Sequence, residues 1–325
     1  MEEYVVRTED EWDVYIHRYP PGPEASGRPV LFVHGMGANR FNFDLNESHS
    51  LSRFLSGRGY DSWVVELRGR GRSVHEDKKK NDWNFEDFLH QDLKSAVAFI
   101  REKTGSPMHW VGHSMGGILG LAYVECYGNE NVRSLTLFGT PMAFGRRQWG
   151  LKLWGLMVQV HRFIPTMDQE TWGRRMLPLV NKNRKALNFF LRYLANPDNM
   201  DTATALDIFD KLVTNEAPGI VLQFSDWVRN GDIRSVDRSY NYTENLGRVD
   251  IPAVFISGVT DLMAPAENTA RHMKRLGSSR VKQIVLSLKN GFSADYGHGD
   301  LIMGKNSPKE VYPKVAEWIA EMDAR

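Results

Sequence analysis

The chain has 325 residues, which is long enough for one large core with an insertion or for two domains. Its 41 lysines and arginines nearly balance its 40 aspartates and glutamates, so the near-neutral charge indicates no basic surface for nucleic acid. Hydrophobic residues form 42% of the chain, as in ordinary globular proteins, and no run approaches the ~18 apolar residues of a membrane span.

The N-terminal segment alternates apolar and polar residues. This alternation predicts two antiparallel strands, at residues 4–8 and 12–19, joined by an acidic turn. The segment lacks the basic and apolar regions of a secretory signal peptide. Cys126 is the single cysteine, which excludes an intrachain disulfide, so we expect a cytoplasmic protein. Cys126 falls in an apolar segment, where we expect it to be a small buried side chain.

An apolar strand predicted at residues 29–33 runs directly into His34-Gly35-Met36-Gly37. The two glycines allow the backbone of this loop to bend inward. Backbone N–H groups in such a loop can hold the negative charge that forms on a carbonyl oxygen under nucleophilic attack. We therefore predict that the main chain of Met36, and not its side chain, contributes to an oxyanion hole.

The most informative segment is residues 112–116, Gly-His-Ser-Met-Gly, which matches the G-x-S-x-G nucleophile elbow. A short apolar strand is predicted before it, at 108–111, and a helix of small and apolar residues after it, at 117–127. This strand–turn–helix context is the one that the motif requires, and it presents Ser114 above the edge of a sheet. The N–H of Met115 is the second predicted oxyanion donor.

A serine nucleophile needs a base and an acid that orients the base. Asp261 lies three residues beyond a strand predicted at 253–258, and His298 lies between two glycines after a strand predicted at 281–286. The chain order Ser114, Asp261, His298 is the one expected for this fold. Other carboxylates follow a strand less cleanly, namely Asp92, Asp295 and Asp300.

The remaining histidines and acids show no metal-ligand spacing, so we expect neither a metal nor a cofactor. His34 and His113 flank the predicted site, and we expect them to serve packing and hydrogen bonding.

These elements together make the chain resemble an α/β-hydrolase, over roughly two thirds of its length. Residues 59–73 resemble the family's fourth strand and the R-G-x-G-x-S loop after it. The HGMG loop, GVTDLMAP around Asp261 and YGHGDLIMGKNSPKEVYPKV around His298 resemble acid lipases of the gastric and lysosomal type. The same pieces resemble the polyhydroxyalkanoate-synthase-like branch, which uses a cysteine nucleophile. Serine at position 114 favours hydrolysis instead.

The alternation of strands and helices predicts an α/β fold with a mostly parallel central sheet covered on both faces. Strand patterns stop after residue 141 and resume at 252, and helices are predicted between them at 150–164, 184–195 and 202–214. The resemblance implies a helical cap at this place. We expect residues 1–141 and 250–325 to form a discontinuous catalytic domain and residues 142–249 to form the inserted cap.

The predicted activity is hydrolysis of a carboxylic ester with a hydrophobic acyl group, through an acyl-serine intermediate. Apolar cap residues and one loop residue are candidates for the substrate pocket, although they could instead form the cap's own core: Trp149, Trp154, Met157 and Met263. Thioester, amide or lactone hydrolysis, or acyl transfer, would use the same triad. A non-catalytic scaffold that binds an apolar ligand or partner is the alternative from a different class. The substrate is expected to be a small ester or a lipid-like molecule, and the sequence does not indicate the oligomeric state.

Overall fold

The computed structural model describes residues 1–22, 25, 27–77, 79–145, 148, 171 and 194–324. Over these ranges, nine strands form one sheet in the order β1-β2-β4-β3-β6-β7-β8-β9, with β5 paired to β2. The strands are β1 (Glu2–Arg7), β2 (Trp12–Tyr19), β3 (Pro29–Val33), β4 (Asp61–Glu66), β5 (Val74–His75), β6 (Met108–His113), β7 (Val132–Phe138), β8 (Ala253–Gly258) and β9 (Val281–Leu286). Every pair from β4 to β9 along the sheet is parallel, whereas β2 pairs antiparallel with β1, β4 and β5.

Helices cover both faces of this sheet. The α-helices are α1 (Leu51–Ser56), α2 (Phe85–Asp87), α3 (Lys94–Thr104), α4 (Met115–Tyr127), α8 (Thr202–Asp207), α9 (Pro218–Asn230), α10 (Ala266–His272), α11 (Asp300–Met303), α12 (Ser307–Glu310) and α13 (Tyr312–Asp323). Two π-helical segments are η2 (Phe88–Leu93) and η4 (Ile208–Leu212). Short 3₁₀ segments are η1 (Arg40–Asn42), η3 (Pro197–Asn199), η5 (Asn245–Arg248), η6 (Met273–Arg275) and η7 (Leu288–Asn290).

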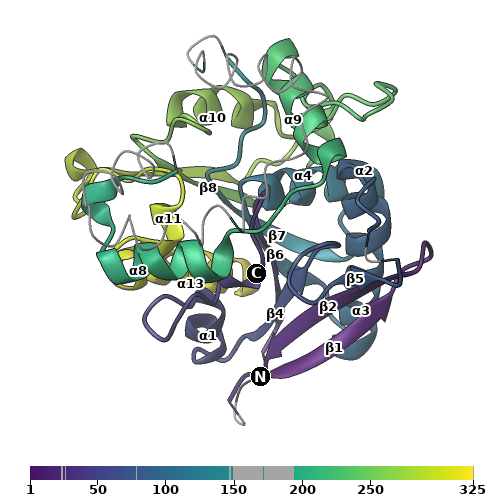
Figure 1. Ribbon diagram of the computed structural model, residues 1–325. Helices are drawn as coiled ribbons and strands as arrows, with labels where there is room; N and C mark the ends of the chain where they lie inside the picture. Colours follow the sequence, from purple (N-terminus) through teal and green to yellow (C-terminus); the bar gives the residue numbers. More distant parts are fainter. Residues whose placement is uncertain are drawn as a thin grey trace.

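Strand β3 shows how the sheet divides the core. All five of its residues are buried, because parallel strands in this class of fold are covered on both faces. Leu31 and Val33 pack in one hydrophobic cluster with residues of α3 and α4, and Val30 and Phe32 pack in a second cluster with residues of α1 and α13. Successive side chains of a strand point to opposite faces, so each helix pair covers one side of the sheet (Figure 1).

The predicted fold class is confirmed: the central sheet is mostly parallel and lies between helices. The predicted strands at the N-terminus and at 29–33, 108–111, 253–258 and 281–286 are all present. The segment predicted as a helix at 202–214 forms α8 and η4. The predicted helix at 150–164 lies outside the described residues, and so do residues 184–193 of the helix predicted at 184–195. Strands β7 and β8 are neighbours in the sheet although over a hundred residues separate them. The division into a catalytic domain and a cap stays a prediction.

The expectation for Cys126 is wrong, because this residue is exposed. It lies near the C-terminal end of α4, where the helix leaves the core. The sequence of α4 is apolar on nearly all sides, so it gave no signal for the face that remains open to solvent.

Within the described ranges no helix combines the length and the apolar character that crossing a bilayer requires. The cytoplasmic location stays a prediction.

Candidate active site

Ser114 occupies the turn between β6 and α4 with a strained backbone, φ 52° and ψ −115°. Such a conformation is rare for a residue with a side chain and persists only where its surroundings impose it. Here the surroundings are close backbone contacts. A Cβ on Gly116 would collide with the carbonyl group of Val33, and one on Gly112 would collide with the main chain of Gly116. Glycine is therefore required at both positions, as the motif predicts.

Hydrogen bonds fix the main chain of Ser114 at the start of α4. Its N–H donates to the carbonyl oxygen of Phe138 at 2.8 Å, which ties the turn to the end of β7. Its own carbonyl oxygen accepts from the N–H groups of Gly117 and Ile118, at 3.0 and 3.1 Å. The residue thus begins the helix while its backbone remains outside helical geometry, so the side chain is presented at the carboxyl edge of the sheet.

Asp261 and His298 form a buried pair on the loops after β8 and β9. The His298 Nδ1 atom lies 2.8 Å from Asp261 Oδ2, and both side chains are at least nine-tenths buried. The other oxygen of Asp261 accepts from the N–H groups of Met263 and Ala264, at 2.8 and 2.9 Å. With the carboxylate held by two backbone donors, its second oxygen fixes the orientation of the imidazole.

Gly139 connects this pair with Ser114. It directly follows Phe138, the residue that accepts the Ser114 N–H, and it has a positive φ of 48°. A Cβ at this position would lie 2.8 Å from His298 Nδ1 and 3.0 Å from Asp261 Oδ2. The end of β7 is therefore in contact with the pair on one side and with the elbow on the other, so the predicted triad residues converge at one edge of the sheet.

The loop after β3 lies against the elbow. A Cβ on Gly35 would be 3.4 Å from the Cβ of Ser114. The N–H groups on either side of Met36 are occupied, since Gly35 donates to Asn42 Oδ1 at 3.1 Å and Gly37 donates to Glu216 at 2.9 Å. The Met36 N–H has no acceptor within the described part of the chain, so it can donate a hydrogen bond to a substrate.

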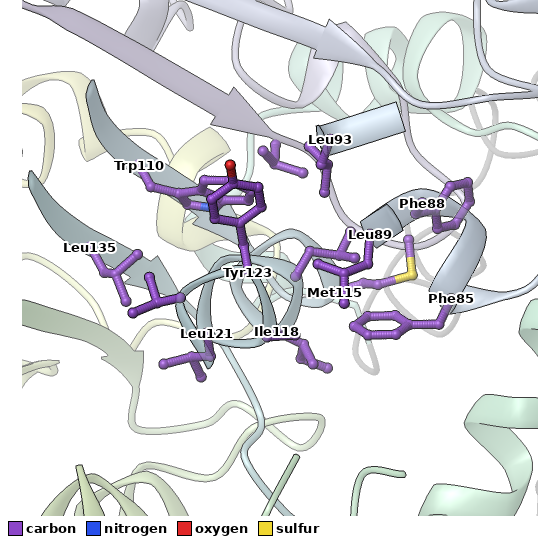
Figure 2. Close-up of a cluster of buried hydrophobic side chains, with 14 of the residues drawn as sticks. Phe85, Phe88, Leu89, Leu93, Trp110, Met115, Ile118, Leu121, Tyr123 and Leu135 are labelled. Carbon is purple, nitrogen blue, oxygen red and sulfur yellow. The ribbon is translucent and has the colours of Figure 1, made fainter. Parts of the chain in front are cut away.

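Met115 is the first residue of α4, so its N–H has no partner within the helix. Its side chain is buried, and Figure 2 shows it among Phe85, Phe88 and Leu89. The side chain thus anchors the start of the helix, and the role of the main-chain N–H in an oxyanion hole stays a prediction.

His113 and His34 are buried beside the site, and both serve hydrogen bonding. His34 Nδ1 lies 2.9 Å from the Gly35 carbonyl oxygen, and its Nε2 accepts from the Leu67 N–H at 3.2 Å. Burial lowers the pKa of His34 to about 4 and the pKa of His113 well below its usual value. Both rings are therefore neutral at pH 7, and neither adds charge to the site.

The rival carboxylates are engaged elsewhere. Asp92 accepts from the backbone and the guanidinium of Arg68, each at 2.8 Å. Asp300 accepts from the N–H of Gly297 and from two asparagines, Asn196 and Asn199. Asp295 accepts from the Leu288 N–H at 2.9 Å. These bonds support Asp261 as the acid of the site.

The predicted pocket residues Trp149, Trp154 and Met157 lie outside the described residues. Met263 is described and partly buried, and its carbonyl oxygen accepts from Gln148 Nε2 at 2.7 Å. It lies beside Asp261, and its contact with substrate stays a prediction. No cluster of three or more metal-ligating side chains occurs among the residues that the structure covers.

Comparison with known proteins places this geometry in a family. A family model described as alpha/beta hydrolase fold matches residues 28–293. The chain belongs to this family. It is 26% identical to the gastric triacylglycerol lipase of Homo sapiens, over 98% of this chain and 88% of the lipase. It is 21% identical to the poly(3-hydroxyalkanoate) polymerase subunit PhaC of Haloarcula marismortui, over 93% of this chain and 62% of that protein.

Solved structures agree on the fold. An esterase from Exiguobacterium antarcticum superimposes with a TM-score of 0.64 at 16% identity, covering 97% of this chain and 98% of the esterase. The predicted resemblance to both branches of the family is confirmed by these matches. They also agree with the prediction that the chain is a hydrolase for carboxylic esters.

Four residues shape the site although the sequence did not predict a role for them: Asn42, Arg70, Gly139 and Glu216. Only Gly139 carried a local signal, since it lies in the segment Phe-Gly-Thr-Pro at residues 138–141, where the strand patterns stop. The other three act through partners that are far away in the sequence. Asn42 contacts His113 across 71 positions, and Arg70 contacts Glu216 across 146.

Proposed function

We propose that the chain is a serine hydrolase that cleaves a carboxylic ester with a hydrophobic acyl group. The observation that carries this proposal is the buried Asp261–His298 pair beside a serine in a strained elbow conformation. A serine hydroxyl needs an oriented base to become a nucleophile, and these residues can supply one.

The reaction has two steps. His298 Nε2 accepts the Ser114 hydroxyl proton as Oγ attacks the carbonyl carbon, and it then gives this proton to the leaving alcohol. An acyl-Ser114 ester remains. Water then attacks that ester, again losing a proton to His298, and the acid leaves as the proton returns to Ser114 Oγ. Asp261 orients the imidazole through Nδ1 and stabilises its charged form in both steps.

The negative charge of each tetrahedral intermediate falls on the former carbonyl oxygen. We assign the main-chain N–H groups of Met36 and Met115 to hold it, because one has no other acceptor and the other begins α4. Two fixed donors cost no reorganisation when the charge develops.

The substrate class rests on two supports. The relatives named above include a triacylglycerol lipase and an esterase, and the segment expected to form the cap at 142–249 is rich in large apolar residues. We therefore propose a small ester or a lipid-like ester as substrate, with the acyl chain under the cap. Thioesters, amides, lactones or a second alcohol as acyl acceptor would use the same groups.

The test is covalent labelling with a fluorophosphonate probe, together with turnover of p-nitrophenyl butyrate. The wild-type chain should be labelled, and Ser114→Ala should lose both the label and the turnover, by about 10⁴- to 10⁶-fold in kcat. Ser239→Ala, which changes an exposed serine, should behave as wild type. Full turnover by Ser114→Ala would refute the proposal, and an unlabelled, inactive wild type would favour the binding scaffold.

A further inference from the structure

The loop that carries Met36 is bonded to a segment from the other half of the chain, residues 211–217. The Thr214 N–H donates to the Gly37 carbonyl oxygen at 2.9 Å, and Asn39 Nδ2 donates to the Lys211 carbonyl oxygen at 2.8 Å. Lys211 lies in η4, one of two π-helical segments in the described part of the chain. Such segments are rare and often occur at functional sites. The segment belongs to the region expected to form the cap.

Glu216 makes the most direct of these contacts. Its side chain is 2% exposed, and its Oε2 accepts from the Gly37 N–H at 2.9 Å. Its other oxygen accepts from the Ala217 N–H at 3.0 Å and from the guanidinium of Arg70. Each oxygen of this buried carboxylate is therefore occupied, and one of them is used by the loop of the oxyanion hole.

Arg70 comes from the loop after β4 and is 1% exposed. Besides Glu216, its guanidinium donates to the carbonyl oxygens of Gly69 and Asn215. An isolated carboxylate in such a buried place would be costly, so the arginine is what allows Glu216 to remain there as an anion.

The geometry of Met36 follows from these bonds, because a peptide group is planar. The plane that contains the Met36 N–H also contains the Gly35 carbonyl, whose oxygen lies 2.9 Å from His34 Nδ1. The next plane contains the Gly37 N–H, which Glu216 holds. Both planes that flank the Met36 Cα are thus anchored, one from each side, and the direction of the Met36 N–H is fixed before substrate arrives.

We propose that Glu216, held by Arg70, is a positioning residue for the oxyanion hole and makes catalysis depend on the placement of segment 211–217. This inference rests on the function proposed above. Glu216 acts through the main chain of Met36 and Gly37 and does not touch the reacting atoms.

The charge of Glu216 makes the inference specific. The Glu216 carboxylate accepts from the N–H of Gly37, the residue that follows the proposed oxyanion donor Met36. Its negative charge repels the negative charge of the intermediate unless a cation neutralises it. Removing Arg70 alone leaves that charge in place. Removing both charges loses the positioning bond but also removes the repulsion. The single loss of Arg70 should therefore damage catalysis more than the loss of both.

The experiment compares Glu216→Gln, Arg70→Met and the double variant. The readouts are kcat and KM for p-nitrophenyl butyrate and Ki for an alkyl trifluoromethyl ketone, whose adduct with Ser114 places an oxyanion in the hole. Glu216→Gln should lower kcat about ten- to hundredfold, raise Ki by a similar factor and leave KM within about threefold. Arg70→Met should be slower still, and adding Glu216→Gln to it should restore part of the rate.

Asp92→Asn is the matched control. It alters another buried carboxylate that pairs with an arginine of the same loop, Arg68, and the hydrogen bonds of this carboxylate go to Arg68 and not to residues 35–39. Its Ki should equal that of wild type whatever the change in melting temperature. If Glu216→Gln does not fold, Arg70→Met/Glu216→Met replaces the pair by apolar side chains of similar volume and should fold while keeping a raised Ki.

Two outcomes separate this inference from the proposed function. An unchanged Ki in a folded Glu216 variant, or additive effects of the two single changes on kcat, would overturn the positioning role alone. If the trifluoromethyl ketone does not inhibit the wild-type chain and the fluorophosphonate does not label it, the proposed function is overturned instead.

Discussion

The imidazole of His113 packs against that of His298, with the ring centroids 4.8 Å apart. His113 Nε2 lies 3.3 Å from the His298 carbonyl oxygen, and its Nδ1 lies 3.0 Å from Asn42 Oδ1. Asn42 Oδ1 also accepts from the Gly35 N–H. His113 therefore contacts the loop of His298 directly and the loop of Met36 through Asn42, while its own backbone belongs to the elbow. We expect this side chain, which takes no part in the proposed reaction, to hold these three segments in place.

Asp261→Asn should lower kcat by about 10⁴-fold without unfolding the protein, because the asparagine cannot support the charged imidazole in the correct tautomer. Asp300→Asn should act differently. Its carboxylate holds the backbone of Gly297 and Asn196, so the change should lower the melting temperature more than the activity of the folded fraction. Steady-state kinetics and thermal unfolding of both variants check this. The reverse pattern would make Asp300 the acid.

Gly139→Ala should nearly abolish activity through a single methyl group. The added Cβ would lie 2.8 Å from His298 Nδ1, closer than side-chain atoms tolerate, and the positive φ adds strain. The imidazole must move away from Asp261, and a displacement of about 1 Å costs on the order of 10²-fold in rate. Kinetics on the soluble, folded variant are the measurement. Gly105→Ala is the control, since its φ is also positive but its Cβ would meet open space.

Glu125→Gln should change how stability depends on pH. Glu125 lies buried on α4, and burial raises the pKa of its carboxyl to about 8. Between about pH 4.5 and 8 the folded chain keeps a proton that the unfolded chain releases, so the free energy of unfolding falls as pH rises, by up to about 1.4 kcal/mol per unit. The variant loses this dependence.

The melting temperature of Glu125→Gln relative to wild type should therefore increase steadily from pH 5 to pH 8. Glu130→Gln, at an exposed glutamate close by, should leave the dependence unchanged. Parallel curves for Glu125→Gln and wild type would contradict the prediction.

The acyl chain of the substrate should be short to medium in length. Each CH₂ that enters an apolar pocket contributes about 0.8 kcal/mol, or about a fourfold gain in kcat/KM, until the pocket is full. A series of p-nitrophenyl esters from acetate to palmitate, kept below micelle-forming concentrations, locates that limit. A rise that continues through palmitate, with activation at a lipid–water interface, would identify a true lipase instead.

The strands and the three candidate triad positions could be predicted because each has a local signal. A buried parallel strand is a short apolar run. Ser114 and Asp261 lie one and three residues beyond such a run, and His298 lies between two glycines in the loop that follows another. Arg70 and Glu216 have no such signal. Each is an ordinary charged residue in the sequence, and only folding brings them together across 146 positions. The exposure of Cys126 was missed for a related reason, since the pattern of α4 shows no polar face.

The order of the sheet has a consequence for refolding. Strands β3, β6, β7, β8 and β9 are consecutive neighbours, and each ends at one part of the site. A slip of one residue between two of them would shift a catalytic group by about 3.3 Å and turn its strand's side chains to the opposite face. Pairing β7 with β8 also closes a loop of more than a hundred residues, which is slow. Turnover therefore returns only when every strand is in register, later than the helical circular dichroism signal, and serves as a direct assay of the completed sheet.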